Sequence, residues 1–139
     1  MSGFRLGGLL RLRRLEEERA AAELAQANAE RKAAAKRRAQ AAVALGTAQF
    51  ATGDEASFQA AVAGRASLMG LLEESALLLA VAQDRADDAQ RTWSGRRTVV
   101  RTLEKLEERH DAAEVTEELR VEQQLADEVA LRDRERQDP

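Results

Sequence analysis

A single histidine and its acidic neighbours are the residues of this 139-residue chain whose types could hold a metal ion. His110 lies within two helical turns of Glu107, Glu114 and Glu117, so an imidazole and two carboxylates could meet on one helix face. A histidine on a helix face is far more often structural, and the chain has no cysteine that could supply a thiolate ligand or a disulfide. We therefore expect neither a metal site nor a bound cofactor.

Catalytic patterns are missing from the sequence as well. No serine or threonine has a plausible general base beside it. The two glycine-containing stretches, Leu6-Gly7-Gly8-Leu9 and Ala63-Gly64-Arg65, lack the spacing and the lysine of a phosphate-binding loop. We expect that the protein is not an enzyme and does not hydrolyse nucleotides by itself.

Two basic segments could bind nucleic acid or a membrane surface. Arg31-Lys32 and Lys36-Arg37-Arg38 place five cations within about two helical turns. No aromatic residues interleave them, and the chain carries a net charge of −3, so we expect a solvated face that pairs with acidic residues across a hairpin, and no nucleic-acid partner. The amphipathic start, residues 4–14, suits an anionic membrane surface or the end of a coiled coil, so we expect at most a peripheral membrane association.

Membrane-spanning and secretion signals are not expected. The longest apolar stretch, Leu68 to Ala82, is interrupted by Gly70, Glu73, Glu74 and Ser75, which argues against a transmembrane helix. The amino terminus has arginines but no continuous apolar core before a cleavage site. We therefore expect a cytoplasmic protein.

The composition predicts long helices. Aromatic residues make up 3% of the chain and charged residues 34%, and the only proline stands at the last position. A globular core depends on large side chains, whereas alanine-rich, charge-rich sequence is typical of extended helices. Residues 1–48 carry a net charge of +5 and residues 101–139 one of −6, which favours an antiparallel alignment of the two ends.

Heptad spacing identifies a seam in the first predicted helix. Alanine recurs at every seventh position, at Ala20, Ala27, Ala34, Ala41 and Ala48. The companion row consists of Leu10, Glu17, Leu24, Arg31, Arg38 and Leu45. Small residues along one row let a partner helix approach closely, and polar residues in the other help to set the register.

A turn former and a helix cap separate this helix from the next. Gly53 interrupts the pattern, and Asp54, or alternatively Ser57, can accept a hydrogen bond from the first free amides of a second helix. Phe50 and Phe58 flank the turn, and we expect them to pack together at the tip of a hairpin.

The second heptad pattern is the stronger one. Steps of four and three residues connect Phe58, Val62, Arg65, Met69, Leu72, Ala76, Leu79, Gln83, Ala86, Gln90 and Trp93. The same steps continue through Val99, Leu103, Leu106, His110 and Ala113. Gly95 allows either a continuous or kinked helix or a full turn that would give three helices. We favour the former, because one glycine costs a helix only about 1 kcal/mol.

These patterns predict an all-α fold, an elongated antiparallel two-helix coiled coil in which the second helix is longer and is continuous or kinked near Gly95. One domain, residues 1–139, contains a helix over about 4–48, a turn over about 49–55, a second helix over about 56–134 and a frayed C-terminus.

Both ends of the chain resemble the FliJ family of flagellar export proteins. The resemblance rests first on the opening, residues 4–17, with Phe4-Arg5-Leu6, Leu9-Leu10, Leu12-Arg13 and Glu16-Glu17 before an alanine-rich helix. It rests also on the later segment 103–132, which contains Leu103-Glu104-Lys105-Leu106-Glu107-Glu108-Arg109, Glu118, Arg120, Glu122-Gln123, Ala126-Asp127-Glu128 and Arg132. Residues 40–95 carry no specific match.

The resemblance implies a non-catalytic coiled-coil stalk that couples a hexameric export ATPase to a transmembrane export gate in type III protein export, with export chaperones as further candidate partners. It implies a cytoplasmic location at the inner-membrane export apparatus. On this basis we expect Leu106, Arg109, Glu122 and Asp127 to face the ATPase. We expect Leu45, Phe50, Phe58, Val62 and Met69, at the hairpin tip, to face the gate.

Two other functions fit the sequence. A self-associating structural coiled coil would show the same heptads without an ATPase partner. A secreted helical hairpin with a W-x-G turn would use Trp93-Ser94-Gly95 as that turn.

Overall fold

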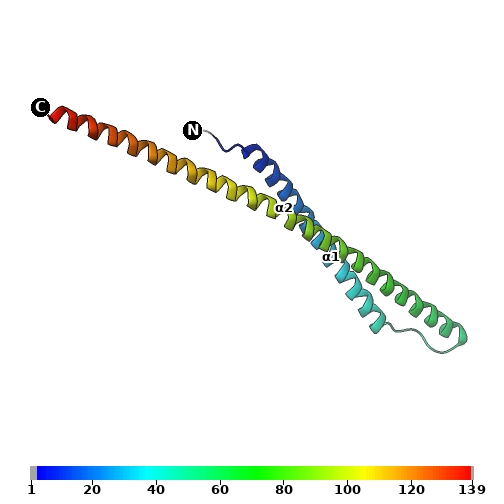
Figure 1. Ribbon diagram of the computed structural model, residues 1–139. Coiled ribbons are helices and arrows are strands. Elements are labelled where there is room, and N and C mark those ends of the chain that lie inside the picture. Colours follow the sequence, from blue (N-terminus) through cyan, green and yellow to red (C-terminus); the bar gives the residue numbers. More distant parts are fainter. Residues whose placement is uncertain (1–2, 139) are drawn as a thin grey trace. The chain divides into compact units, whose positions relative to one another are not determined.

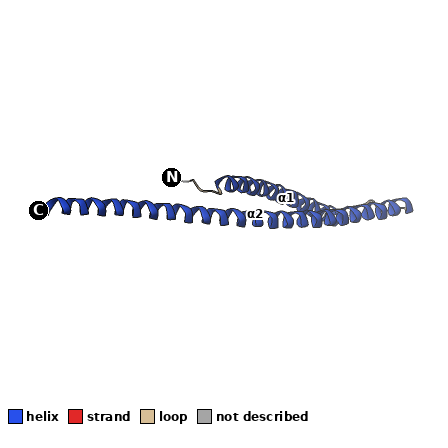
Figure 2. Ribbon diagram, turned by 45° about the horizontal axis from the view of Figure 1, so that its top comes forward, coloured by secondary structure: helices blue, strands red, loops and turns tan. Residues whose placement is uncertain are grey.

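The computed structural model describes residues 3–138 and contains two helices and no strand among those residues (Figures 1 and 2). Helix α1 spans Gly7–Thr47 and helix α2 spans Glu55–Gln137. The expected all-α helical hairpin is confirmed. Helix α2 continues through Gln137, although the charged sequence there led us to expect fraying. Residues 1, 2 and 139, which the expected domain includes, lie outside the described residues.

The connection between the helices uses the expected turn and cap residues. Gly53 has a φ of 152°, a backbone conformation that side-chain-bearing residues rarely adopt. Asp54 is the N-cap of α2, because its Oδ1 accepts a hydrogen bond of 2.8 Å from the backbone N–H of Ser57. This bond also lowers the pKa of the Asp54 carboxyl, since it favours the charged form.

Helix α2 is continuous through Trp93, Ser94 and Gly95. The alternative of a chain reversal at Gly95, with three helices, is therefore wrong. The interpretation of Trp93-Ser94-Gly95 as a W-x-G turn is wrong for the same reason. A lone glycine inside a long heptad pattern costs too little free energy to end the helix.

The chain divides into two compact units, and the larger is formed by Glu16–Arg96. In this unit α1 packs on α2 through the predicted alanine row. Ala20, Ala27, Ala34 and Ala41 are all between 5% and 8% exposed, so this row is the α1 side of the seam. The long side chains of Arg31 and Arg38, which we assigned to the companion row, are exposed.

On α2 one predicted row is confirmed and the other is displaced by one residue. Leu72, Leu79, Ala86 and Trp93 are buried or half-buried, as expected. The second row is formed by Ala61, Leu68, Ser75 and Ala82, whereas Val62, Met69 and Gln83 of the predicted row are exposed and only Ala76 of that row is half-buried. Alanine and serine here let α2 approach the alanines of α1 closely, whereas the larger Val62 and Met69 lie on the surface.

Trp93 and Arg96 of α2 make polar contacts with α1 in this unit. The indole Nε1 of Trp93 donates a hydrogen bond of 3.1 Å to Oε1 of Glu17. Nη1 of Arg96 lies 3.3 Å from Oε2 of Glu16. In both contacts α1 supplies the carboxylate, although the charge distribution led us to expect basic residues on the first helix and acidic ones on the second.

The smaller unit combines the described residues of Met1–Leu15 with those of Arg97–Pro139. Its core consists of Leu10 and Val100, each 1% exposed, with Leu103 beside them. The ring of Phe4 lies on the imidazole of His110, with 5.6 Å between the ring centroids. Arg14 pairs with Glu104 at 3.5 Å, which matches the expected attraction between a basic start and an acidic end.

Helix α2 contains one 18-residue stretch that is apolar enough to cross a membrane by length and composition, contrary to our expectation from the sequence. Only 6% of this stretch is buried, so most of its apolar side chains are accessible. This criterion is weak for a single helix, and we treat the stretch as an exposed apolar surface.

Candidate functional site

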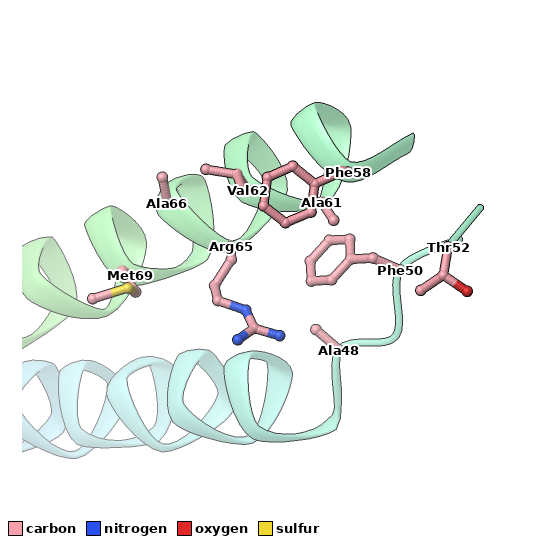
Figure 3. Close-up of a pocket in the computed structure, with 9 residues that line it drawn as sticks. All are labelled: Ala48, Phe50, Thr52, Phe58, Ala61, Val62, Arg65, Ala66 and Met69. Carbon is pink, nitrogen blue, oxygen red and sulfur yellow. The ribbon is translucent and has the colours of Figure 1, made fainter. Parts of the chain in front are cut away.

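The hairpin tip carries an apolar depression of about 500 Å³ in the larger unit (Figure 3). Four of the five residues expected at the tip line it: Phe50, Phe58, Val62 and Met69. Phe58 is 67% exposed, a large value for an aromatic side chain, and Val62 and Met69 are also exposed. The fifth residue, Leu45, is half-buried on α1 and is not part of the lining.

Phe50 is held in this depression by a close approach to Gly64. A Cβ atom added to Gly64 would lie 2.5 Å from Cε1 of Phe50, well inside van der Waals contact. Glycine at this position on α2 therefore makes room for the aromatic ring. The contact of Gly64 with Phe50 was not predicted from the sequence. Its only signal was a glycine inside a helical pattern, and we had examined Gly64 only to exclude a phosphate-binding loop.

Arg65 is the charged residue of the depression. Figure 3 shows its side chain reaching from α2 toward the last turn of α1, near Ala48. Since α1 has no basic residue in its own last turn, Arg65 supplies a cation near the negative end of that helix. We had placed Arg65 in the heptad seam, but its side chain is exposed.

The four residues expected to face the ATPase all lie on the α2 segment of the smaller unit, and all are exposed. Leu106 is 39% exposed, whereas its neighbour Leu103 is 7% exposed, so Leu103 and not Leu106 is in the seam. At about 100° per residue, Arg109 and Asp127 share one face of the helix and Glu122 lies about 140° away around the axis. One flat partner surface could therefore contact Arg109 and Asp127 together but not Glu122.

Helix α2 is unpartnered beyond Glu114, because every described residue from Val115 to Asp138 is exposed. Apolar side chains nevertheless recur along this C-terminal segment: Val115, Leu119, Val121, Leu125, Val129 and Leu131. Contacts within the helix stabilise it locally. Arg120 donates to both carboxylate oxygens of Glu117, at 3.0 and 2.7 Å, which lowers the pKa of Glu117.

His110 has two carboxylates beside it, those of Asp111 and Glu114, and the three ligand atoms lie within 4.8 Å of one another. Asp111 is 3.5 Å from Nδ1 and Glu114 is 3.5 Å from Nε2. Because the carboxylates lie at different ring nitrogens and an imidazole binds one ion through one nitrogen, the group presents a poor ligand set. We assign no metal to it. Of the carboxylates expected near His110, only Glu114 belongs to this group.

The family model described as "Flagellar FliJ protein" matches residues 1–138, which is nearly the whole chain. No curated protein and no solved structure matches the chain.

Proposed function

Because this chain belongs to the flagellar FliJ protein family, we propose that it is the non-catalytic coiled-coil component that couples a hexameric export ATPase to the transmembrane export gate. It acts in the cytoplasm, peripherally associated with the inner-membrane export apparatus, and export chaperones are further candidate partners. The observation that carries this proposal is the large apolar side chains exposed on both units, which give a protein without catalytic groups two surfaces for partners.

The C-terminal segment of α2 is the surface that we assign to the ATPase. Its exposed residues, from Val115 onward, make no contact with α1 that would bury them. A single helix of this kind gains most of its stability from tertiary packing, so a partner that covers the apolar side chains would stabilise it. Residues 111–137 hold nine acidic and four basic residues, a net charge of −5, which favours a basic partner surface. Leu106, Arg109 and Asp127 are proposed to contact this surface, and Glu122, about 140° away around the helix axis, is proposed to contact a second part of the ATPase.

The hairpin tip is the surface that we assign to the export gate. Phe58, Val62 and Met69 are exposed around a depression, and exposed aromatic and methionine side chains are enriched at protein interfaces. Phe50 contributes through its position against Gly64. Leu45, which lies outside the depression, supports the fold of the tip in this proposal.

Reciprocal variants test the two assignments. The protein is mixed at micromolar concentration with the purified cognate export ATPase or with the cytoplasmic domain of the gate, and complexes are separated by gel filtration. Arg109→Ala is expected to weaken the ATPase complex and leave the gate complex unchanged. Phe58→Ala is expected to do the opposite. Because both side chains are exposed, circular dichroism should show unchanged helicity in each variant.

Two outcomes would contradict the proposal. One is that the wild-type protein fails to co-elute with the ATPase. The other is a loss of helicity in both variants, which would show that Arg109 and Phe58 are structural. The exposed apolar residues also permit the alternative of a self-associating coiled coil. Light scattering on the wild-type chain distinguishes the two, because the proposed function predicts a monomer and self-association predicts a dimer or tetramer.

A further inference from the structure

A second apolar groove lies between the helices of the larger unit, apart from the hairpin tip. It has a volume of about 410 Å³ and is lined by Arg37, Ala41 and Ala44 of α1 and by Leu71, Ser75 and Leu78 of α2, with Gln40 and Glu74 at its edges. A neighbouring depression shares Gln40 and Ala44 and extends the surface to Lys36 and Val43. None of the residues in these two depressions lines the hairpin-tip depression.

The groove has the geometry that accepts a third helix. On α1 the lining residues recur at i, i+4 and i+7, and on α2 Leu71, Ser75 and Leu78 do the same. Alanines form the α1 wall, while Leu71 and Leu78 are 49% and 50% exposed on the α2 wall. Ser75 lies at the floor of the groove, and its hydroxyl already donates a hydrogen bond of 2.7 Å to the Leu71 carbonyl. An apolar side chain can therefore enter the groove without leaving the Ser75 hydroxyl buried and without a hydrogen-bond partner.

The rim of the groove is basic on the α1 side. Arg37 lines the groove, Lys36 lines the neighbouring depression, and Arg31, Lys32 and Arg38 lie within two turns along the same helix. None of these five cations forms an ion pair with another residue of the described chain, although we expected them to pair across the hairpin. Their charge is therefore available to an anionic partner within a Debye length of about 8–10 Å.

We propose that this groove binds an amphipathic helix with an apolar stripe and an acidic flank, contributed by a partner protein. The apolar stripe packs between Ala41 and Ala44 on one side and Leu71 and Leu78 on the other. The acidic flank faces Lys36 and Arg37. A flat anionic membrane fits less well, because the surface is concave and Glu74 on the α2 side repels anionic headgroups, whereas a helix can turn its acidic flank to the α1 side alone.

Two labelled helical peptides test the proposal with the full chain. Both have the same leucine stripe over three heptads, and their flanking positions are all glutamate in one and all glutamine in the other, since lysine would also be attracted to the acidic C-terminal segment. Fluorescence anisotropy at low salt is expected to show the acidic peptide binding at least about tenfold more tightly, with the difference falling as salt rises. Leu78→Glu should abolish this binding. The double variant Lys36→Glu/Arg37→Glu should remove or invert the preference.

Exposed positions in the smaller unit supply matched controls. Leu15→Glu and Arg5→Glu/Arg11→Glu make the same chemical changes away from the groove and should leave peptide binding unchanged. Equal affinity for the two peptides, or an equal loss in the control variants, would overturn the proposal. Binding to anionic lipid vesicles that Leu78→Glu abolishes would overturn it in favour of a membrane. A dimer in sedimentation equilibrium that Leu78→Glu dissociates would overturn it in favour of a second copy of the chain.

Discussion

Replacing Gly64 by alanine tests the packing of the hairpin tip. Two effects of opposite sign are expected. Alanine inside a helix is more favourable than glycine by about 0.5–1 kcal/mol, because glycine loses more backbone entropy on folding. The new Cβ would, however, lie 2.5 Å from Cε1, 3.2 Å from Cζ and 3.3 Å from Cδ1 of Phe50, so the ring must move.

The size of the net effect follows from comparing these two contributions. Overpacking of this kind typically costs about 1–3 kcal/mol. We therefore expect Gly64→Ala to leave the free energy of unfolding unchanged at best and to lower it by about 2.5 kcal/mol at most. Because Phe50 is in a loop and its ring is the part that collides, the ring can also leave the depression, which would expose it and place the result near the mild end of this range.

Gly70→Ala is the matched control. Gly70 lies on the same helix, and a Cβ there would meet no atom within 4 Å. This variant should be more stable than the wild type by about 0.5–1 kcal/mol. Urea unfolding followed by circular dichroism at 222 nm measures both variants. In a Phe50→Ala background, Gly64→Ala should become stabilising, like Gly70→Ala, since no ring remains to collide with.

The result that would refute this reasoning is specific. If Gly64→Ala stabilises the wild-type chain as much as Gly70→Ala does, the ring of Phe50 is not packed on Gly64 in solution. The depression would then have a different lining from the one in Figure 3.

Three further predictions concern the caps and the cores. Leu10→Ala should lower the free energy of unfolding by about 2–5 kcal/mol in urea titrations, because Leu10 is 1% exposed, and a change below 1 kcal/mol would show that this core does not form. Asp54→Ala should lower the melting temperature at pH 7 by removing the bond to Ser57. Since that bond lowers the folded-state pKa of Asp54 below the value of about 3.9 of an unfolded aspartate, the stabilisation is present above that pH and is lost as the pH falls through the folded pKa. Thermal melts of wild type and variant should therefore differ more at pH 7 than at pH 2. Trp93→Phe should cost about 1 kcal/mol by removing the hydrogen bond to Glu17, and Glu17→Gln, which keeps an acceptor, should cost less in the same urea assay.

Much of the fold could be predicted from the heptad periodicity and from the residues of the turn and the helix cap. The alanine row of α1 was correctly predicted because strict seven-residue spacing places small residues on one stripe, and close packing needs small residues. Asp54 was identified as the cap because a short acceptor side chain three residues before free amides has one common role. Four of the five tip residues were brought together for the same local reason, since they flank one turn.

The sequence did not predict which of two adjacent rows of residues on α2 faces the seam. In α2, Val62 and Met69 are larger and more apolar than Ala61 and Ser75. A prediction based on apolar residues therefore chooses the row of Val62 and Met69, although Ala61 and Ser75 belong to the row that lies in the seam. Burial in this seam does not follow apolar character alone, because Ala61, Ser75 and Ala82 are buried or half-buried, whereas the more apolar Val62 and Met69 are exposed. The heptad pattern placed Leu103 and Leu106 in the seam together, and only Leu103 is buried. The groove at Leu71 and Leu78 was visible in the sequence only as a widening of the apolar stripe, which does not indicate whether a third helix of the same chain covers it.

The distribution of side-chain size between the seam and the surface bears directly on function. In the larger unit the buried α1 positions are alanines, whereas Leu71, Leu77 and Leu78 are between 49% and 70% exposed. A chain optimised for its own stability would bury the leucines, since each fully buried leucine contributes about 1.5–3 kcal/mol. Exposed leucines contribute little to folding, so their free energy of burial remains available to a partner. The exposed leucines therefore favour binding to a partner over the stability of the free hairpin. Polar substitution of Leu77 or Leu78 should weaken complexes much more than it lowers the helicity of the free protein.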